Sequence, residues 1–203
     1  MKLLYVPPTT SSWTEISAAQ VDVDAVPPVT RLRLCWPLGE VNADRTAVGA
    51  VLAFSPWIGG RCDLEHEFSA LTGQRLVEWF QDQGIWVAPS PVHAGPLPLP
   101  RGSHRYSLSG DASASPELRF ADSLCGSGES PAGVRIASNL GILIANAPTI
   151  AAGFEMRLGA AVLIAESLSI SELVDPEFEA AAPEAFSRAQ RLIECVGLGL
   201  RSA

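Results

Sequence analysis

Runs of apolar and alternating residues divide the first part of the chain into predicted strands. Residues 20–26 (QVDVDAV) and 31–36 (RLRLCW) alternate polar and apolar positions with a period of two, which is typical of strands with one buried face. Residues 2–6 (KLLYV) form a short apolar run that Pro7 and Pro8 end. We therefore expect three short strands before residue 40.

Residues 48–54 (VGAVLAF) form an unbroken apolar run, which predicts a strand buried on both faces. A loop at 55–62 follows, then a helical pattern over about 64–83 and a second short strand at 85–88. Strand, loop, helix and strand in this order predict a right-handed parallel βαβ unit over residues 48–88. The predicted fold class is α/β or α+β, with a mixed sheet and helices packed on it.

A proline-rich segment separates this unit from the second half of the chain. Residues 89–103 hold five of the sixteen prolines, which excludes a helix and predicts an extended crossing. We expect one domain over residues 1–203, with this segment as the candidate sub-boundary, and no internal repeat is evident. The further predicted elements are a hairpin of 104–108 and 117–121, helices at 130–139, 149–157 and 183–196, and strands at 141–147 and 160–166.

Composition places the chain among globular proteins and narrows the choice of partners. Of its 203 residues, 47% are hydrophobic and 18% are charged, and the net charge of -8 disfavours binding to nucleic acids and anionic membranes. The four cysteines are far apart with no CxxC, and the N-terminus lacks a signal peptide's apolar core. One lysine against thirteen arginines indicates a bacterial, GC-rich coding sequence. We expect a cytoplasmic protein with reduced thiols and no cofactor.

The stretch SPWIGGRCDLEHEF, residues 55–68, carries the first candidate site. Gly59, Gly60 and Arg61 lie between the predicted buried strand and the predicted helix. Backbone N–H groups of such a glycine turn can bind an anion, and ligands of open parallel sheets gather at the ends of strands. This pattern makes the three residues the candidate ligand-binding loop, although no GxGxxG or GxxxxGK[ST] motif is present.

Two other interpretations of the same stretch stay open. Cys62 and His66 are four residues apart, so on a helix both could bind zinc, but no second pair of ligands accompanies them. Alternatively, Asp63 caps the predicted helix, and the acidic residues Glu65 and Glu67 lie in its first turn, where the helix dipole favours negative charge. The capped helix is the favoured interpretation, and no metal site is predicted.

A second candidate site combines three residues from distant segments. Cys125 lies in a Gly/Ser loop that leads into a predicted helix, a setting that activates a thiol as a nucleophile. His104 is the candidate base, and Glu166, at the end of a predicted strand, is the candidate residue that orients it. The alternative is that Cys125 is an ordinary cysteine in a surface loop, since no spacing rule links these residues.

These patterns favour a non-catalytic accessory or assembly protein of the bacterial cytoplasm that acts through a protein–protein surface. The nucleophile elbow GxSxG is absent, and the chain has only three histidines. An acidic run between residues 166 and 184 is either a solvated face or a surface for a basic partner. The alternative function is a small cytoplasmic α/β hydrolase or transferase acting on a polar small molecule through the Cys/His pair. The oligomeric state stays open.

Overall fold

The structure is a computed structural model in which one mixed sheet and five α-helices make up the described part of the chain. The strands are β1 (Lys2–Val6), β2 (Thr14–Ala19), β3 (Arg31–Leu34), β4 (Arg61–Leu64), β5 (Trp86–Ala88), β6 (His104–Ser107), β7 (Glu117–Ala121), β8 (Gly133–Ser138), β9 (Gly141–Ala145), β10 (Ile170–Val174) and β11 (Gly199–Arg201). The helices are α1 (Ala43–Phe54), α2 (Ala70–Trp79), α3 (Phe154–Ile164), α4 (Pro176–Ala181) and α5 (Pro183–Glu194), with a 3-10 turn, η1 (Ser55–Trp57). The described residues are 1–6, 14–21, 23–27, 30–34, 41–81, 84–88, 99, 101–108, 117–121, 133–138, 141–145 and 154–202.

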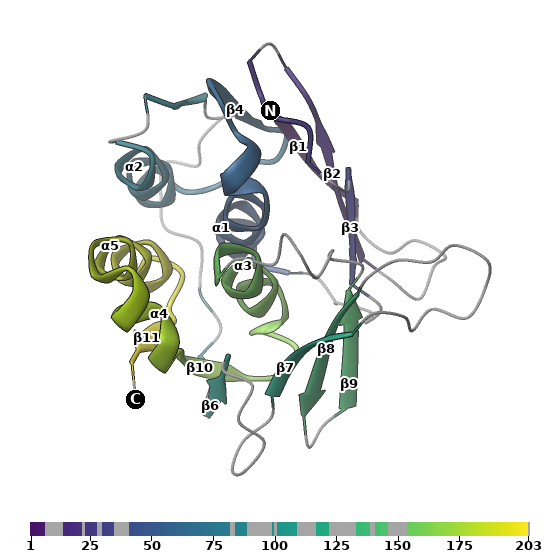
Figure 1. Cartoon of the computed structure of the whole chain (residues 1–203), viewed down its shortest axis with the longest axis vertical. Coiled ribbons are helices and arrows are strands. Elements are labelled where there is room, and N and C mark those ends of the chain that lie inside the picture. The colour runs from purple at the N-terminus through teal and green to yellow at the C-terminus, as the bar shows by residue number, and fades with distance from the viewer. Residues whose placement is uncertain are drawn as a thin grey trace, which may run out of the picture.

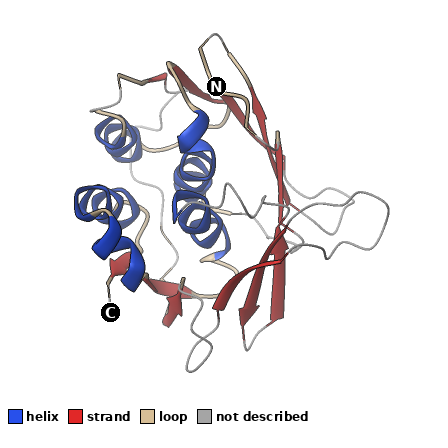
Figure 2. Ribbon diagram, in the orientation of Figure 1, coloured by secondary structure: helices blue, strands red, loops and turns tan. Residues whose placement is uncertain are grey.

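The sheet is strongly curved and its helices lie on the concave side. Its strand order is β11-β10-β6-β7-β8-β9-β3-β2-β1-β4-β5. Figure 1 shows the sheet bending around α1 and α3, while α2 and α5 lie on the side away from β3 and β9. All helices are therefore gathered inside the curve of the sheet, as the colouring in Figure 2 makes clear. This arrangement is the predicted mixed sheet with parallel pairs and packed helices.

The predicted strand at 48–54 is wrong, because these residues belong to helix α1. The side chain of Asn42 accepts hydrogen bonds from the N–H groups of Asp44 and Arg45, so it caps the helix. Every residue from Asp44 to Phe54 is buried, and a helix surrounded by protein is apolar on all sides. Such a helix has no visible period, so its apolar run resembles that of a buried strand.

Because residues 48–54 are helical, the βαβ unit predicted over residues 48–88 is not present in the predicted form. The helix predicted at 64–83 begins later, because residues 61–64 form β4 and Ser69 caps α2. β4 and β5 are parallel neighbours with α2 between them in sequence, in the register Arg61↔Trp86 to Asp63↔Ala88. The strand at 86–88 therefore has a parallel neighbour, but this neighbour is β4 and not residues 48–54.

In the second half of the chain, too, a buried helix lies where the sequence predicts a buried strand. Residues 160–166, predicted as a strand, lie mostly in α3, which is buried from Leu158 to Ile164. Residues 133–138 form β8 rather than the predicted helix, and β6 and β7 are parallel neighbours rather than a hairpin. The predicted strand at 2–6 is present with the same ends, and the elements predicted at 31–36, 85–88, 141–147 and 183–196 are present within the described residues as β3, β5, β9 and α5. The described part of 20–26 is not a strand.

The two halves of the chain have the same topology. In the first, β1 pairs antiparallel with β2 and parallel with β4, β2 pairs with β3, and β4 pairs with β5. In the second, β6 and β7 together take the place of β1, and β8, β9, β10 and β11 repeat the other pairings. The order of helices between the strands is also repeated, with α4 as an addition. The two halves are joined in sequence between β5 and β6; the predicted sub-boundary at 89–103 stays a prediction, since most of that segment lies outside the described residues.

Equivalent elements of the two halves contact one another. β3 pairs antiparallel with β9, α1 packs on α3, and α2 packs on α5. Reciprocal contacts of this kind are what a two-fold arrangement produces. The sequence retains a trace of the repeat: α2 contains QRLVEW (74–79), and QRLIEC (190–195) covers the end of α5 and its C-terminal cap, Cys195. After each helix a glycine with positive φ, Gly84 or Gly197, precedes the next strand.

Two glycines allow α1 and α3 to approach closely where they cross. A Cβ atom on Gly159 would lie 2.6 Å from the carbonyl oxygen of Gly49 and 2.7 Å from the backbone nitrogen of Ala53. A Cβ atom on Gly49 would lie 2.5 Å from Cγ of Leu163. Since backbone atoms cannot rotate away, only glycine at position 159 lets the two central helices approach this closely.

We expect Gly159→Ala to lower the free energy of unfolding by roughly 1–3 kcal/mol, the usual cost of overpacking a core. This loss would occur although Ala improves helix propensity by about 1 kcal/mol. Urea unfolding measures the difference. Gly73→Ala is the matched control, because a Cβ atom at position 73 of α2 meets only ring atoms of Phe68, the nearest at 3.2 Å. Equal stability of both variants would show that the helix crossing tolerates a side chain.

Candidate functional site

The predicted ligand loop at 59–61 is occupied by another segment of the same chain. The N–H of Gly59 donates to Oδ1 of Asp24 at 2.9 Å, and a Cβ atom on Gly59 would lie 2.4 Å from the carbonyl oxygen of Val23. The N–H of Ala25 donates to the carbonyl oxygen of Trp57 at 3.0 Å. The glycine at position 59 therefore makes room for residues 23–25, and its N–H already binds a carboxylate within the chain.

Asp24 is the centre of this contact and was not identified from the sequence. Its Oδ2 lies 2.5 Å from the ammonium group of Met1 and accepts a hydrogen bond from the N–H of Val21 at 2.8 Å. Burial by itself would raise the pKa of Asp24, but the hydrogen bonds from the ammonium group, Gly59 and Val21 outweigh it and hold that pKa below its usual value. Asp24 thus ties β1, the 23–27 segment and the glycine loop together.

Arg61, the third predicted loop residue, is the first residue of β4 and its side chain is exposed. Its Nε lies 2.7 Å from Oδ1 of Asp63, and its carbonyl oxygen accepts a hydrogen bond from the Met1 ammonium group. Asp63 is a strand residue, so the prediction that it caps a helix is wrong. The cap is Ser69, whose hydroxyl oxygen accepts from the N–H of Thr72.

The cysteine and histidine considered as zinc ligands do not lie on one helical face, because Cys62 is in β4 and His66 is in the following loop. Burial raises the pKa of the Cys62 thiol to about 12. Among the residues that the structure describes, no group of three His, Cys, Asp or Glu side chains could hold a metal ion.

Both ring nitrogens of His66 are buried, and neither has a hydrogen-bond partner among the described residues. Burial lowers the pKa of the imidazole, and the nearby Asp44 carboxylate opposes this effect only in part. The ring lies edge-on to Phe68, with 6.4 Å between the ring centroids. Oδ1 of Asp44 accepts from the N–H of Ser69 at 2.6 Å, so His66 lies in a buried connection between α1 and α2.

Of the three residues of the predicted Cys/His site, the structure describes His104 and Glu166. Cys125 lies outside the described residues, so its part in a site stays a prediction. His104 is an exposed residue of β6, and its N–H donates to the carbonyl oxygen of Ser169. Glu166 follows α3 and accepts a hydrogen bond from the N–H of Asn42 at 3.1 Å. Glu166 therefore has a partner at the start of α1.

Cys195 is the C-terminal cap of α5, and its thiol does not have the lowered pKa of an activated nucleophile. Burial raises the pKa of this thiol to about 11, although a contact with the hydroxyl group of Thr72 lowers it slightly. Its Sγ donates to the carbonyl oxygen of Leu192 at 2.9 Å. With Cys62, this makes two thiols that stay protonated at neutral pH, whereas nucleophilic catalysis uses the thiolate.

A cluster of exposed apolar side chains surrounds the same glycine loop. Trp86 of β5 is 73% exposed, and Val23 and Val26 are 72% and 70% exposed. The N–H of Trp86 donates to the carbonyl oxygen of Gly60 at 2.8 Å, and a Cβ atom on Gly60 would lie 2.8 Å from Cγ2 of Val23. These contacts place Val23 and Trp86 on either side of Gly60, and Val26 lies three residues after Val23 in the same segment. We call Val23, Val26 and Trp86 the β5 edge patch.

None of the helices in the described ranges combines the length and the apolar character that crossing a bilayer requires. Comparison of the chain with models of protein families, with curated proteins and with solved structures finds no match. The function must therefore be argued from the chemistry of the surfaces and buried groups described above.

We expect Asp24→Asn to destabilise the chain that carries the free Met1 ammonium group by roughly 3 kcal/mol, because a buried charge would lose its partner. The pKa of Asp24 is lowered by folding, so its contribution is complete above about pH 4 and is lost as the pH falls through the folded pKa. Urea unfolding at pH 7 and pH 3 measures both effects. Asp63→Asn, at a more exposed pair, is the control and should change stability by less than about 1 kcal/mol. Equal effects of the two substitutions would contradict the role of Asp24.

We expect His66→Phe to improve stability relative to the natural chain more at pH 5 than at pH 8. The folded state lowers the pKa of His66, so the unfolded state binds the proton more tightly, and the natural chain loses stability as the pH falls below the unfolded value of about 6.5. Urea titrations of both chains at the two pH values provide the measurement. If the difference in stability between the two chains were the same at both pH values, titration of His66 would not be the cause of the loss of stability at low pH.

Proposed function

We propose that this chain is a non-catalytic accessory or assembly protein of the bacterial cytoplasm and that it binds a partner protein at the β5 edge patch. The observation that carries the proposal is the 73% exposure of Trp86 on the last strand of the sheet. Large aromatic side chains are enriched among the residues that dominate binding energy at protein interfaces. Val23 and Val26 extend the apolar surface around it.

The backbone of β5 supports the same proposal. β5 pairs with β4 on one side and has no neighbouring strand on its other side within the described ranges. The N–H of Trp86 points toward Gly60, so the N–H and carbonyl groups of the next residue, Val87, point to the open side, because neighbouring residues of a strand alternate in direction. An extended segment of a partner could pair with these groups and cover Trp86.

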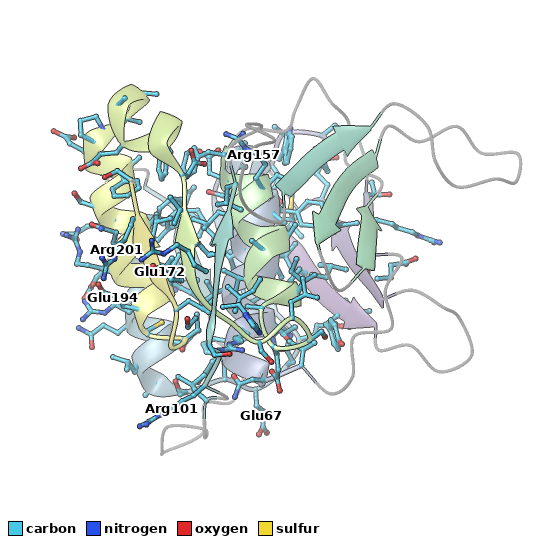
Figure 3. The ribbon with its side chains drawn as sticks, turned by 90° about the horizontal axis from the view of Figure 1, so that it is seen from below. Glu67, Arg101, Arg157, Glu172, Glu194 and Arg201 are labelled. Carbon is cyan, nitrogen blue, oxygen red and sulfur yellow. The ribbon has the colours of Figure 1, made fainter. Side chains whose placement is uncertain are left out.

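Comparison of the two sheet edges adds a second line of support. β11 is the equivalent edge strand of the second half, and it places Gly199 opposite Glu172 where β5 places Trp86 opposite Arg61. Nε of Arg201 in β11 lies 2.5 Å from Oε1 of Glu172, a contact visible in Figure 3. A charged edge resists pairing with other strands, whereas an edge that exposes tryptophan invites it.

The chemistry of the partner follows from charge. The net charge of -8 repels a second copy of the chain and attracts a basic protein. Part of the predicted acidic surface is used within the fold, since Glu172 contacts Arg105 and Arg201 and Asp175 caps α4. We therefore propose a neutral or basic partner with an extended apolar segment, rather than self-association.

The test uses a photo-crosslinking amino acid at position 26, so that Trp86 stays intact. We expect one protein from an extract to be crosslinked in a saturable manner and to be displaced by the unlabelled natural chain. Trp86→Ser as competitor should displace it at least about tenfold less well, as expected for loss of a dominant interface residue. Val77→Ser is the matched control, because Val77 is 51% exposed on α2 outside the β5 edge patch.

A basic partner, once purified, should bind the natural chain more weakly as salt rises, since opposite charges are screened, whereas the binding of a neutral partner should change little. Equal competition by Trp86→Ser and Val77→Ser would contradict the proposed surface. A crosslinked product made of two copies of this chain would contradict the proposed partner.

A further inference from the structure

The segment that carries two residues of the β5 edge patch has its polar and apolar side chains in an inverted arrangement. Asp24 is 5% exposed, whereas Val23 just before it and Val26 two residues after it are 72% and 70% exposed. The hydrophobic effect favours the opposite arrangement, with the valines buried and the carboxylate in water. Some other interaction therefore holds this segment with its valines outward.

The carboxylate of Asp24 supplies that interaction through contacts with three parts of the chain. Its Oδ1 accepts a hydrogen bond from the N–H of Gly59 at 2.9 Å. Its Oδ2 accepts from the N–H of Val21 at 2.8 Å and lies 2.5 Å from the ammonium group of Met1. Burial raises the pKa of Asp24, but these contacts outweigh burial and lower it, so the carboxylate is charged at neutral pH. Hydrogen bonds to a charged acceptor are stronger than those between neutral groups.

The backbone of residues 23–27 has weaker attachments than this carboxylate. These residues belong to no helix or strand, so no ladder of backbone hydrogen bonds fixes them. The N–H of Ala25 donates to the carbonyl oxygen of Trp57 at 3.0 Å. The segment also fits closely against Gly59, where a Cβ atom would lie 2.4 Å from the carbonyl oxygen of Val23. Loss of the carboxylate charge should therefore release the segment from the glycine loop.

We propose that Asp24 is the residue that positions Val23 and Val26 for binding of the partner protein at the β5 edge patch. This inference rests on the proposed function and deepens it, because it gives a role to a side chain that has no exposed surface and cannot touch the partner. A segment that is already ordered loses little conformational entropy when a partner binds. A released segment can turn its valines toward the protein and has to be ordered again on binding.

Nuclear magnetic resonance relaxation of the backbone amides tests whether Asp24 holds the segment, and it needs no partner. We expect order parameters of about 0.85 at Val23 and Val26 in the natural chain and below about 0.6 in Asp24→Asn. Order parameters report motion within the folded state, so they do not follow global stability. Gly159→Ala is the matched control, because it should destabilise the chain at the α1–α3 crossing and leave both valines ordered.

The crosslinking competition then tests the effect on binding, with the natural chain labelled at position 26 as the probe. Asp24→Asn as competitor should displace the probe about tenfold less well, as expected when the backbone of at least one more residue has to be ordered on binding. Gly159→Ala should displace it as well as the natural chain does. In a Val23→Ser chain, Asp24→Asn should cost less than tenfold, because one of the residues through which it acts is already missing.

Gly59→Ala provides a second variant in case Asp24→Asn does not fold, which the urea midpoint checks. Its Cβ atom would displace the carbonyl group of Val23 without removing a charge, so we expect the same two effects. Ordered valines in Asp24→Asn, or mobile valines with undiminished competition, would overturn this inference and leave the proposed function intact. Undiminished competition by Trp86→Ser would instead contradict the proposed function, and this inference would fail with it.

Discussion

The contact between Gly49 and Gly159 sets the geometry on which the rest of the structure depends. Two helices can lie at the centre of a curved sheet only if they approach closely enough for the sheet to cover both, and the absence of side chains at the crossing permits that approach. All residues of α1 from Asp44 onward are consequently buried, including two charged ones. Asp44 and Arg45 are satisfied by the backbone of other segments, the N–H of Ser69 and the carbonyl oxygen of Val196. The central helix is thus attached to both halves by polar contacts that a misplaced helix could not make.

Among the described residues, the core around α1 and α3 is filled by buried side chains. The concave side of the sheet is filled by helices, and the glycine loop that resembles an anion-binding turn is filled by residues 23–25. We place the proposed function at the periphery of the described residues, where the sheet ends. The β5 edge patch lies at the end of the sheet, and an open groove lies at the contact between the equivalent outer helices α2 and α5. The two surfaces differ in kind, because the patch is apolar and the groove is lined by charged and polar side chains.

The sequence predicted the elements that have a visible period and failed where burial removes it. The stripe of α5, with Phe186, Ala189, Leu192 and Ile193 buried, was predictable because one face of the helix meets solvent. The apolar runs at 48–54 and 160–166 have no visible period, because α1 and α3 are buried on every side. These runs therefore predict strands where the structure has helices. Asn42 followed by Asp44 was the available signal for α1, since it is the cap and first turn of a helix. The role of Asp24 could not be predicted, because its partners Met1, Val21 and Gly59 come together only through the fold.

A repeated fold makes differences between equivalent positions informative, because packing alone places the same demands on both halves. Where packing dominates, the halves agree: glycine occurs at both sides of the central crossing, and Leu76 and Leu192 are buried at the same place in the outer helices. They disagree at positions that packing does not constrain. β5 exposes Trp86 where β11 has Gly199, and α5 places Arg188 in an open groove where α2 buries Thr72. The exposed side chain of Trp86 does not contribute to the core, so packing does not explain it. The proposed binding of a partner protein at the β5 edge patch gives the exposure of Trp86 a physical reason, at an edge that the common topology leaves accessible.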